Sequence, residues 1–118
     1  MAAKDALGRR GEDIAARHLV VAGFEVVERN WRCSQGEIDI VAREGTELVF
    51  VEVKTRSSVA YGHPLEAITP TKLARLRRLA GAWCEAHPEH KGRVRIDAIA
   101  VIAPAAAPAQ VEHVRGVF

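Results

Sequence analysis

Two acidic residues and one lysine have the types and spacing needed for metal-dependent chemistry. Asp39 is followed, after twelve intervening residues, by the triplet Glu52-Val53-Lys54. Carboxylate oxygens are the ligands that Mg²⁺ and Mn²⁺ prefer in proteins. On a strand, an ammonium two residues further along lies on the same face, about 7 Å away. Asp39, Glu52 and Lys54 are therefore candidate catalytic residues, with the two carboxylates as candidate metal ligands.

These residues can act together only if two strands bring them side by side. Runs rich in β-branched residues predict strands at 24–30, 36–42 and 47–54, separated by glycine-containing turns. The turn between the second and third strands is short enough to make them antiparallel neighbours. If that hairpin aligns Asp39 with Glu52, the two carboxylates lie within about 5 Å of each other.

Alternation along these strands assigns each side chain to a face of the sheet. In the second strand we expect Ile38 and Ile40 on one face, and on the other face Glu37, Asp39 and Val41. The third strand is apolar on both faces over 48–51, which predicts a central strand. A charge there is costly unless it is paired or metal-bound. The alternative is a solvated strand end with an exposed ion pair worth less than about 1 kcal/mol.

Two amphipathic helices complete the predicted domain. Apolar stripes at three- and four-residue spacing predict helices over 5–22, capped by Asp5, and over 69–87, capped by Thr69. Two further strands are predicted at 94–102 and 111–117. The order is α-β-β-β-α-β with a final strand, and the second helix supplies the crossover that a parallel pair requires. We therefore expect an α/β fold with a mixed central sheet flanked by helices.

Length and composition indicate one domain. The 118 residues predict a single domain with a compact core at about 5–102, a linker at 103–109 and a C-terminal strand at 110–118. With 48% hydrophobic and 27% charged residues and no long apolar run, disorder and a transmembrane helix are excluded. The charged N-terminus lacks a secretory signal pattern and two cysteines are too few for a disulfide framework, so we expect a cytoplasmic protein.

Charge is distributed unevenly along the chain. The segment 37–52 contains five acidic residues and one arginine. The segment 72–95 contains seven lysines and arginines and two glutamates. An acidic centre beside a basic segment suits a metal-dependent enzyme acting on a polyanion, although solvated faces show such charges equally often. Trp31 either stacks on a base or covers the sheet edge. The candidate nucleic-acid-binding residues are Lys72, Arg75, Arg77, Arg78, Arg56 and Tyr61.

The Asp39 to Lys54 pattern, set across a strand-turn-strand, resembles the motif of the PD-(D/E)xK nuclease superfamily. The predicted element order also matches the core of that superfamily. The chain further resembles the small bacterial YraN-like family, an uncharacterised group considered related to Holliday junction resolvases and restriction enzymes. The resemblance covers 8–102 and is carried by Gly11-Glu12, Gly36-Glu37-Ile38-Asp39, Leu48 to Arg56 and Gly62-His63-Pro64. Ile38 departs from the proline of the superfamily name, at a position that bears no ligand.

This resemblance implies a restriction-endonuclease-like fold and a hydrolase that uses Mg²⁺ or Mn²⁺. Asp39 and Glu52 would bind the metal, the Val53 carbonyl would be a third ligand, and Lys54 would orient or activate the attacking water. Glu12 matches a glutamate that related resolvases bring from their first helix. We expect Glu12 to point toward the Asp39 and Glu52 carboxylates as a further catalytic residue and ligand. The alternative for Glu12 is a charge that compensates the helix dipole.

Two other groups leave alternatives open. Glu37 is either a further ligand or an exposed edge charge, or it has a basic-partner role with Arg56. The Cys84, His87 and His90 cluster offers too few ligands for a structural zinc site, so we expect Cys84 and His87 to belong to the core of the second helix.

The sequence thus predicts a metal-dependent endonuclease that hydrolyses DNA phosphodiester bonds, with branched or otherwise structured DNA as a substrate class. A rival hypothesis is a catalytically inactive nucleic-acid-binding module of a DNA-processing complex. A third is an interaction domain with unrelated surface charges. No membrane partner is expected, and a homodimer and protein partners are left open.

Overall fold

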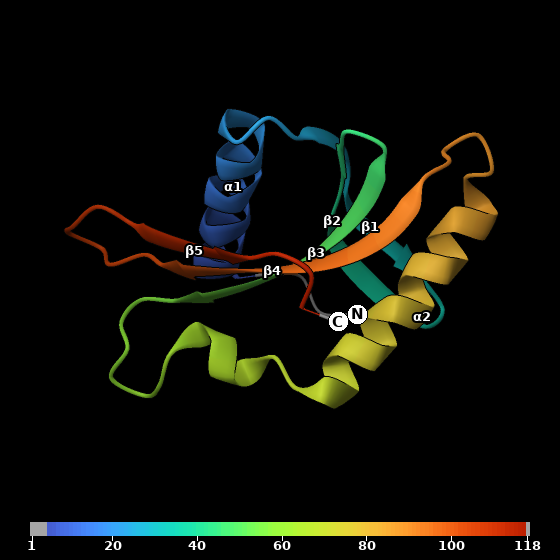
Figure 1. Cartoon of the computed structure of the whole chain (residues 1–118). Coiled ribbons are helices and arrows are strands. Elements are labelled where there is room, and N and C mark those ends of the chain that lie inside the picture. The colour runs from blue at the N-terminus through green and yellow to red at the C-terminus, as the bar shows by residue number, and fades with distance from the viewer. Residues whose placement is uncertain (1–4, 118) are drawn as a thin grey trace.

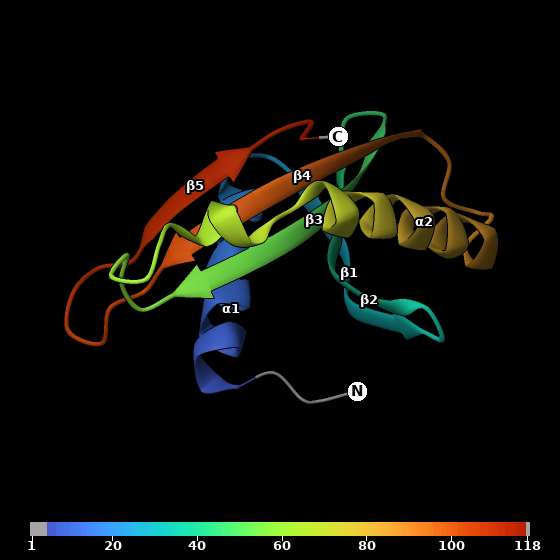
Figure 2. The ribbon, with the colours of Figure 1, turned by 90° about the horizontal axis from the view of Figure 1, so that it is seen from below.

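A five-stranded sheet organises the molecule and carries one helix on each face (Figures 1 and 2). The computed structural model describes residues 5–117, so both ends of the predicted domain, including the last residue of its C-terminal strand, lie outside the described residues. In chain order the elements are α1 (Ala6–Val21), β1 (Glu25–Cys33), β2 (Gly36–Glu44), β3 (Glu47–Arg56), the short 3-10 helix η1 (Pro64–Ala67), α2 (Pro70–Ala86), β4 (Arg93–Ile102) and β5 (Gln110–Val114).

Strand order in the sheet follows chain order, while strand direction is mixed. Strands β1, β2 and β3 form an antiparallel meander, β3 and β4 are parallel, and β5 returns antiparallel to β4. The segment containing α2 makes the crossover between the two parallel strands. The predicted α-β-β-β-α-β order and the mixed sheet flanked by helices are therefore confirmed.

Both helices begin at the residues that the sequence predicts as caps. The Asp5 carboxylate accepts a hydrogen bond from the Gly8 N–H at 2.7 Å, and the Thr69 hydroxyl accepts one from the Lys72 N–H at 3.2 Å. Gly23, with φ of 96°, follows the last turn of α1 in a conformation that glycine adopts without strain. Neither helix in residues 5–117 is both long enough and apolar enough to cross a membrane.

Each face of the sheet has its own hydrophobic cluster. On the face that α1 covers, the cluster of buried residues, which includes two from α1 itself, is Ala15, Leu19, Phe24, Ile40, Ala42, Val49, Val51, Ile99, Val101 and Ala103. On the face that α2 covers, the cluster is Ile38, Val41, Leu48, Phe50, Leu76, Leu79, Ala80, Trp83 and Ile96. Because β3 contributes to both clusters, it is the central strand that its apolar run predicts.

Strand β2 departs from regular alternation. Ile38 packs in the α2 cluster and Ile40 in the α1 cluster, so the prediction that they share a face is wrong. Pairing with β3 begins only at Ile40, opposite Val51, and the preceding part of β2 is not held in the β3 ladder. The residue between the two isoleucines is Asp39.

Strand β1 is longer than predicted, because its pairing with β2 continues until Cys33 lies opposite Gly36. A shift of register between Val26 and Glu28 interrupts the β1 ladder near its start. Such a bulge bends and twists the strand locally. The views in Figures 1 and 2 show the β1–β2 end of the sheet turning away from the plane of β3, β4 and β5.

A buried carboxylate ties the last described residues to β4. Strand β5 ends at Val114 rather than at 117, because Gly116 (φ 62°) turns the chain and its N–H donates to Asp97 at 3.0 Å. Asp97 is fully buried and also accepts hydrogen bonds from Arg95 at 2.9 Å and from His113 at 2.8 Å. Burial by itself would raise the pKa of Asp97, but these three donors hold the pKa at about 2.

Replacing this carboxylate should be costly. We expect Asp97→Asn to lower the free energy of unfolding at pH 7 by about 3 kcal/mol, because it removes the buried carboxylate that pairs with Arg95 and leaves Arg95 only its partly exposed partners Glu44 and Glu47. The folded pKa of about 2 lies below the ordinary value of 3.8. The wild-type protein should therefore lose this stabilisation as the pH falls from about 4 to about 2, and the variant should not.

Urea unfolding over this pH range measures both effects. Glu85→Gln, which neutralises an exposed carboxylate of α2, is the matched control. An Asp97→Asn protein as stable as this control would contradict the stabilising role of the buried cluster.

Candidate functional site

The candidate site lies where β2 and β3 separate. Their pairing ends at Ile40, opposite Val51. Beyond that pair, β3 continues to Arg56 in register with β4. The residues next to the last pair are Asp39 on β2 and Glu52 on β3, so two predicted ligands stand at the mouth of the gap between the strands.

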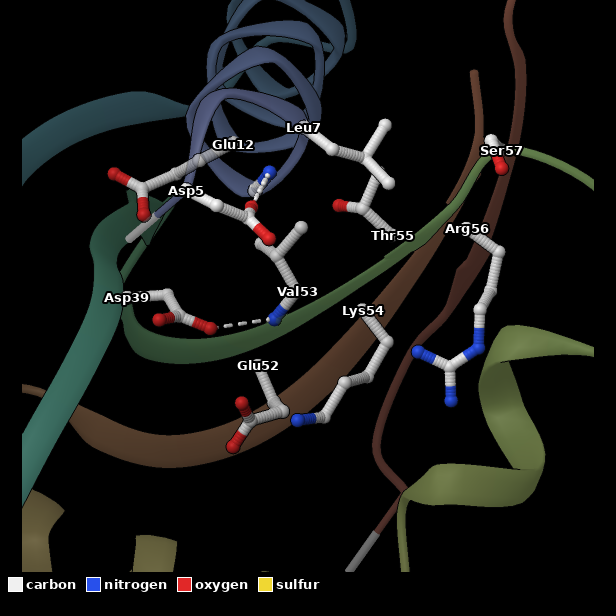
Figure 3. A pocket seen from close by; sticks show the side chains of 11 residues that line it. Asp5, Leu7, Glu12, Asp39, Glu52, Val53, Lys54, Thr55, Arg56 and Ser57 are labelled. Atoms are coloured by element: carbon white, nitrogen blue, oxygen red, sulfur yellow. Dashed lines mark hydrogen bonds between the residues drawn. The ribbon is translucent and has the colours of Figure 1, made fainter. Parts of the chain in front are cut away.

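A side-chain hydrogen bond replaces the ladder at this point. The Asp39 Oδ2 atom accepts a hydrogen bond from the Val53 N–H at 2.8 Å (Figure 3). A backbone N–H that loses its strand partner needs another acceptor, and the Asp39 carboxylate serves as one. The N–H and C=O of one strand residue face the same neighbouring strand, so the Val53 carbonyl also opens toward the gap. Asp39 is thus oriented beside a backbone carbonyl.

Two pockets meet at this gap. The first, of about 490 Å³, lies beside the N-terminal part of α1 and is lined by Asp5, Leu7, Gly8, Glu12, Asp39, Glu52, Val53, Lys54, Thr55, Arg56 and Ser57. The second, of about 280 Å³, lies against α2 and is lined by Glu37, Asp39, Glu52, Lys54, Lys72, Arg75, Leu76 and Leu79. Asp39, Glu52 and Lys54 line both. In Figure 3 the Glu52 and Lys54 side chains leave β3 on the side away from α1, and Lys54 extends toward Glu52.

Glu12 enters the first pocket from α1. It is 1% exposed, and its Oε1 accepts hydrogen bonds from Asn30 at 2.7 Å and from Arg29 at 3.1 Å. Arg29 also donates to Asp13 at 2.6 Å, and the bonds to Asp13 and Glu12 raise the pKa of Arg29 despite its partial burial. The structure therefore places Glu12 in the same pocket as the predicted ligands, with its carboxylate held by two β1 side chains.

These two β1 residues are not among the sequence-predicted site residues. Asn30 has φ of 56°, a left-handed conformation that asparagine tolerates better than most residues. Strand periodicity carries no signal for a left-handed residue inside a strand. The one indication of this conformation in the sequence is the residue type, because Asn30 is an asparagine within a run of residues predicted to be extended.

Gly11 lets α1 approach β3 closely enough to deliver Glu12. A Cβ on Gly11 would lie 1.9 Å from the Thr55 hydroxyl oxygen and 2.7 Å from the Thr55 Cβ. Neither separation is allowed between real atoms, so any larger residue would push the helix away from the strand. The height of α1 over the pocket therefore depends on this glycine.

The predicted nucleic-acid-binding residues fall into different surroundings. Lys72 and Arg75 line the second pocket. Arg75 and Arg78 line a third pocket of about 470 Å³ together with Gln35 and Leu79. Arg56 lines the first pocket. Arg77 lies about 200° around the helix from Arg75, so it projects from the opposite flank of α2.

Three other residues that the sequence analysis names lie away from the gap. Tyr61 is 99% exposed on the loop between β3 and η1 and lines none of these three pockets. His63 caps η1 by accepting from the Leu65 N–H, and it also lies 3.1 Å from Glu112. Trp31 packs against the α2 cluster, so of its two predicted roles it covers the sheet.

Glu37 and Cys84 have structural partners. Glu37 forms an ion pair with Arg32 at 2.6 Å, because the β1–β2 register sets Arg32 directly opposite Glu37. Cys84 packs against the α2 cluster, where burial raises the pKa of its thiol. His87 stacks on the buried Trp83 with ring centroids 4.1 Å apart, as expected for residues of the helix core.

The donor chemistry of the gap fits a small hard cation. Asp39, Glu52 and the Val53 carbonyl all offer oxygen, the ligand type that Mg²⁺ and Mn²⁺ take. Within residues 5–117, no three His, Cys, Asp or Glu side chains are already arranged as a metal site. Two carboxylates and a carbonyl thus form the core of the candidate donor set, and Glu12 would join it by exchanging its bonds to Arg29 and Asn30.

The protein is thus a small α/β domain with acidic residues and a lysine at the point where two strands separate. Residues 11–101 match the model of Uncharacterised protein family UPF0102. A UPF0102 protein of Beutenbergia cavernae is 62% identical over 117 residues, which cover 99% of each chain. One of Frankia casuarinae is 53% identical over 118 residues and covers both chains fully. The chain therefore belongs to the UPF0102 family, and the expected membership of an uncharacterised family is confirmed.

Because α1 approaches β3 closely at Gly11, we expect alanine substitutions at two helical glycines to change stability in opposite directions. Gly11→Ala should lower the free energy of unfolding by about 1–3 kcal/mol, because its Cβ would overlap Thr55. Gly81→Ala in α2, where nothing lies within 4 Å of the new Cβ, should instead stabilise the protein by about 1 kcal/mol through helix propensity. Urea unfolding of both variants measures the difference, and equal stabilisation by the two alanines would refute the tight packing at Gly11.

Proposed function

We propose that this protein is a Mg²⁺- or Mn²⁺-dependent endonuclease of the PD-(D/E)xK superfamily, with a restriction-endonuclease-like fold, that hydrolyses phosphodiester bonds in DNA. The observation that carries the proposal is the position of Asp39, Glu52 and Lys54 at the shared boundary of two pockets, where β2 leaves β3. The resemblance to Holliday junction resolvases favours branched or otherwise structured DNA as the substrate.

The surroundings of the gap suit a polyanionic substrate. Lys72 and Arg75 of α2 line the second pocket, and Arg56, at the end of β3, lines the first. A phosphodiester backbone that crosses the gap would therefore meet cations in both pockets beside the acidic centre. Fixed cations stabilise phosphate charge without having to reorganise during the reaction.

Asp39, Glu52 and the Val53 carbonyl would hold the metal ion. When bound, a divalent cation polarises the phosphoryl group and lowers the pKa of a bound water. The protein keeps these donors in place by two different means: the Val53 N–H orients the Asp39 carboxylate, and the register with β4 fixes the backbone of Glu52. Rigid placement of the donors is what a catalytic site requires.

Lys54 would act on the water and on the phosphate. Hydrolysis joins the water oxygen to phosphorus and breaks one P–O ester bond, and a water proton ends on the leaving oxygen. The Lys54 ammonium, on the same side of β3 as Glu52, would orient the attacking water and offset negative charge that accumulates on the phosphoryl oxygens.

Two observations favour the alternative, a catalytically inactive nucleic-acid-binding module. The Glu12 carboxylate accepts hydrogen bonds from Arg29 and Asn30, and within residues 5–117 no three acidic or histidine side chains are prearranged for a metal. Such a module would bind DNA through its basic residues and show no metal-dependent cleavage.

Single substitutions at the gap separate these functions. Asp39→Asn and Lys54→Ala should each reduce the rate of Mn²⁺-dependent cleavage of a labelled four-way DNA junction by about 10²–10⁴-fold. Asparagine retains an oxygen that can accept from the Val53 N–H, so the Asp39 variant should remain folded. Circular dichroism and urea unfolding verify the fold of both variants.

Lys91→Ala and Glu85→Gln make the same changes of charge at exposed positions and should cleave like the wild type. Cleavage by Asp39→Asn and Lys54→Ala at the wild-type rate would reject the assigned site. Binding of the junction without cleavage in either Mg²⁺ or Mn²⁺ would favour the inactive module.

A further inference from the structure

The three pockets adjoin one another, and the row that they form is called the trough below. The first and second pockets share Asp39, Glu52 and Lys54, and the second and third share Arg75 and Leu79. The trough therefore runs from the N-terminal part of α1, across the gap between β2 and β3, and along the N-terminal half of α2.

Its charge changes sign along this path. The carboxylates lie at the gap, whereas the α2 end presents Lys72, Arg75 and Arg78 on the flank that faces the pockets. These three residues repeat every third position, which spaces them about 4.5 Å apart along the helix axis. Phosphates of one DNA strand repeat about every 3.4 Å along the duplex axis, so long side chains at this spacing can follow a single strand.

Arg75 is held in place by the turn between β1 and β2. Its Nη2 donates to the Gln35 carbonyl at 3.3 Å. The next residue, Gly36, has φ of 144°, and a Cβ there would lie 2.7 Å from the same Nη2. The missing side chain of Gly36 thus leaves the space that the Arg75 guanidinium occupies.

Arg75, like Arg10, is oriented by a backbone carbonyl, whereas four other arginines are oriented by carboxylates. Arg29, Arg32, Arg95 and Arg115 each form an ion pair with a carboxylate. The partner recorded for Arg75 among residues 5–117 is a neutral carbonyl. A guanidinium has five N–H donors in a planar fork, so an arginine oriented by one of them can still offer a pair of donors to a phosphate.

From these contacts we infer that Arg75 binds a backbone phosphate of the nucleic acid and guides that strand from α2 into the gap, and that the Gln35-Gly36 turn positions its guanidinium for this purpose. This inference rests on the proposed function for the identity of the ligand. Gln35 and Gly36 carry no charge. Their role in the β1–β2 turn is to hold Arg75 where it aligns the substrate.

The experiment measures binding in the absence of metal, so that it does not depend on cleavage. A fluorescein-labelled forked DNA, with a duplex stem and two single-stranded arms, is titrated with the full-length chain in EDTA at several NaCl concentrations. Arg75→Ala should weaken binding about tenfold and should reduce the slope of log K against log[NaCl] by about one unit. Arg93→Ala, which removes an exposed arginine at the far end of β4, should change affinity by less than about twofold.

Two further variants test the positioning role. Arg75→Lys should keep the slope of log K against log[NaCl], because the charge is retained. It should lose part of the affinity, because an ammonium lacks the planar fork that donates to the Gln35 carbonyl and also offers two donors to one phosphate. Gly36→Ala should weaken binding in the wild-type background and have little further effect in Arg75→Ala, as expected for two residues that act through one contact. If Gly36→Ala does not fold, the comparison of Arg75→Ala, Arg75→Lys and Arg93→Ala decides the question.

The outcomes separate this inference from the proposed function. An Arg75→Ala protein with wild-type affinity and salt slope overturns the inference, even if the wild type cleaves DNA in Mn²⁺. Reduced stability with an unchanged slope also overturns it, because that result would show Arg75 to be a structural clamp. Loss of affinity and slope without any cleavage by the wild type supports the phosphate contact and rejects the nuclease.

Discussion

The hydrogen bond from the Val53 N–H to the Asp39 carboxylate is the interaction on which the candidate site depends. A central strand that loses one neighbour exposes backbone donors that must be satisfied. Here a side chain of the departing strand satisfies the donor, which allows β2 to separate from β3 without leaving an unpaired N–H at Val53. The same bond holds the Asp39 carboxylate at the point where the strands separate, in the two pockets that Glu52 also lines.

The rest of the fold keeps this opening in place. The apolar clusters on the two faces of the sheet hold β3 rigidly up to the last pair with β2. Gly11 brings α1 against Thr55 and sets Glu12 at one side of the gap, while Arg75 of α2 reaches the β1–β2 turn at the other side. Several charged side chains at one opening disfavour folding unless they are paired or bound to a ligand. Because their presence has this cost, the cluster at the gap indicates a functional role.

The sequence predicts the helices and strands well, because helix caps, apolar periodicity and short turns are local signals. The Asp39 to Lys54 pattern survives in the structure for the same reason: a short hairpin leaves little freedom in its register. Alternation fails at Ile38 and Ile40 because it assumes an unbroken ladder, and nothing local shows that β2 leaves β3 between them. The bond from Asn30 to Glu12 joins distant segments and has no local signal, whereas the separation of Arg77 from Arg75 follows from helical geometry alone.

The central claim is that the gap between β2 and β3 binds a divalent cation through Asp39, Glu52 and the Val53 carbonyl. The most direct measurement is anomalous diffraction from crystals of the protein soaked in Mn²⁺. The account predicts one strong anomalous peak in the gap, about 2.2 Å from an oxygen of each of the three donors. A map with no peak in the gap at saturating Mn²⁺, or with manganese bound only elsewhere on the surface, would contradict it.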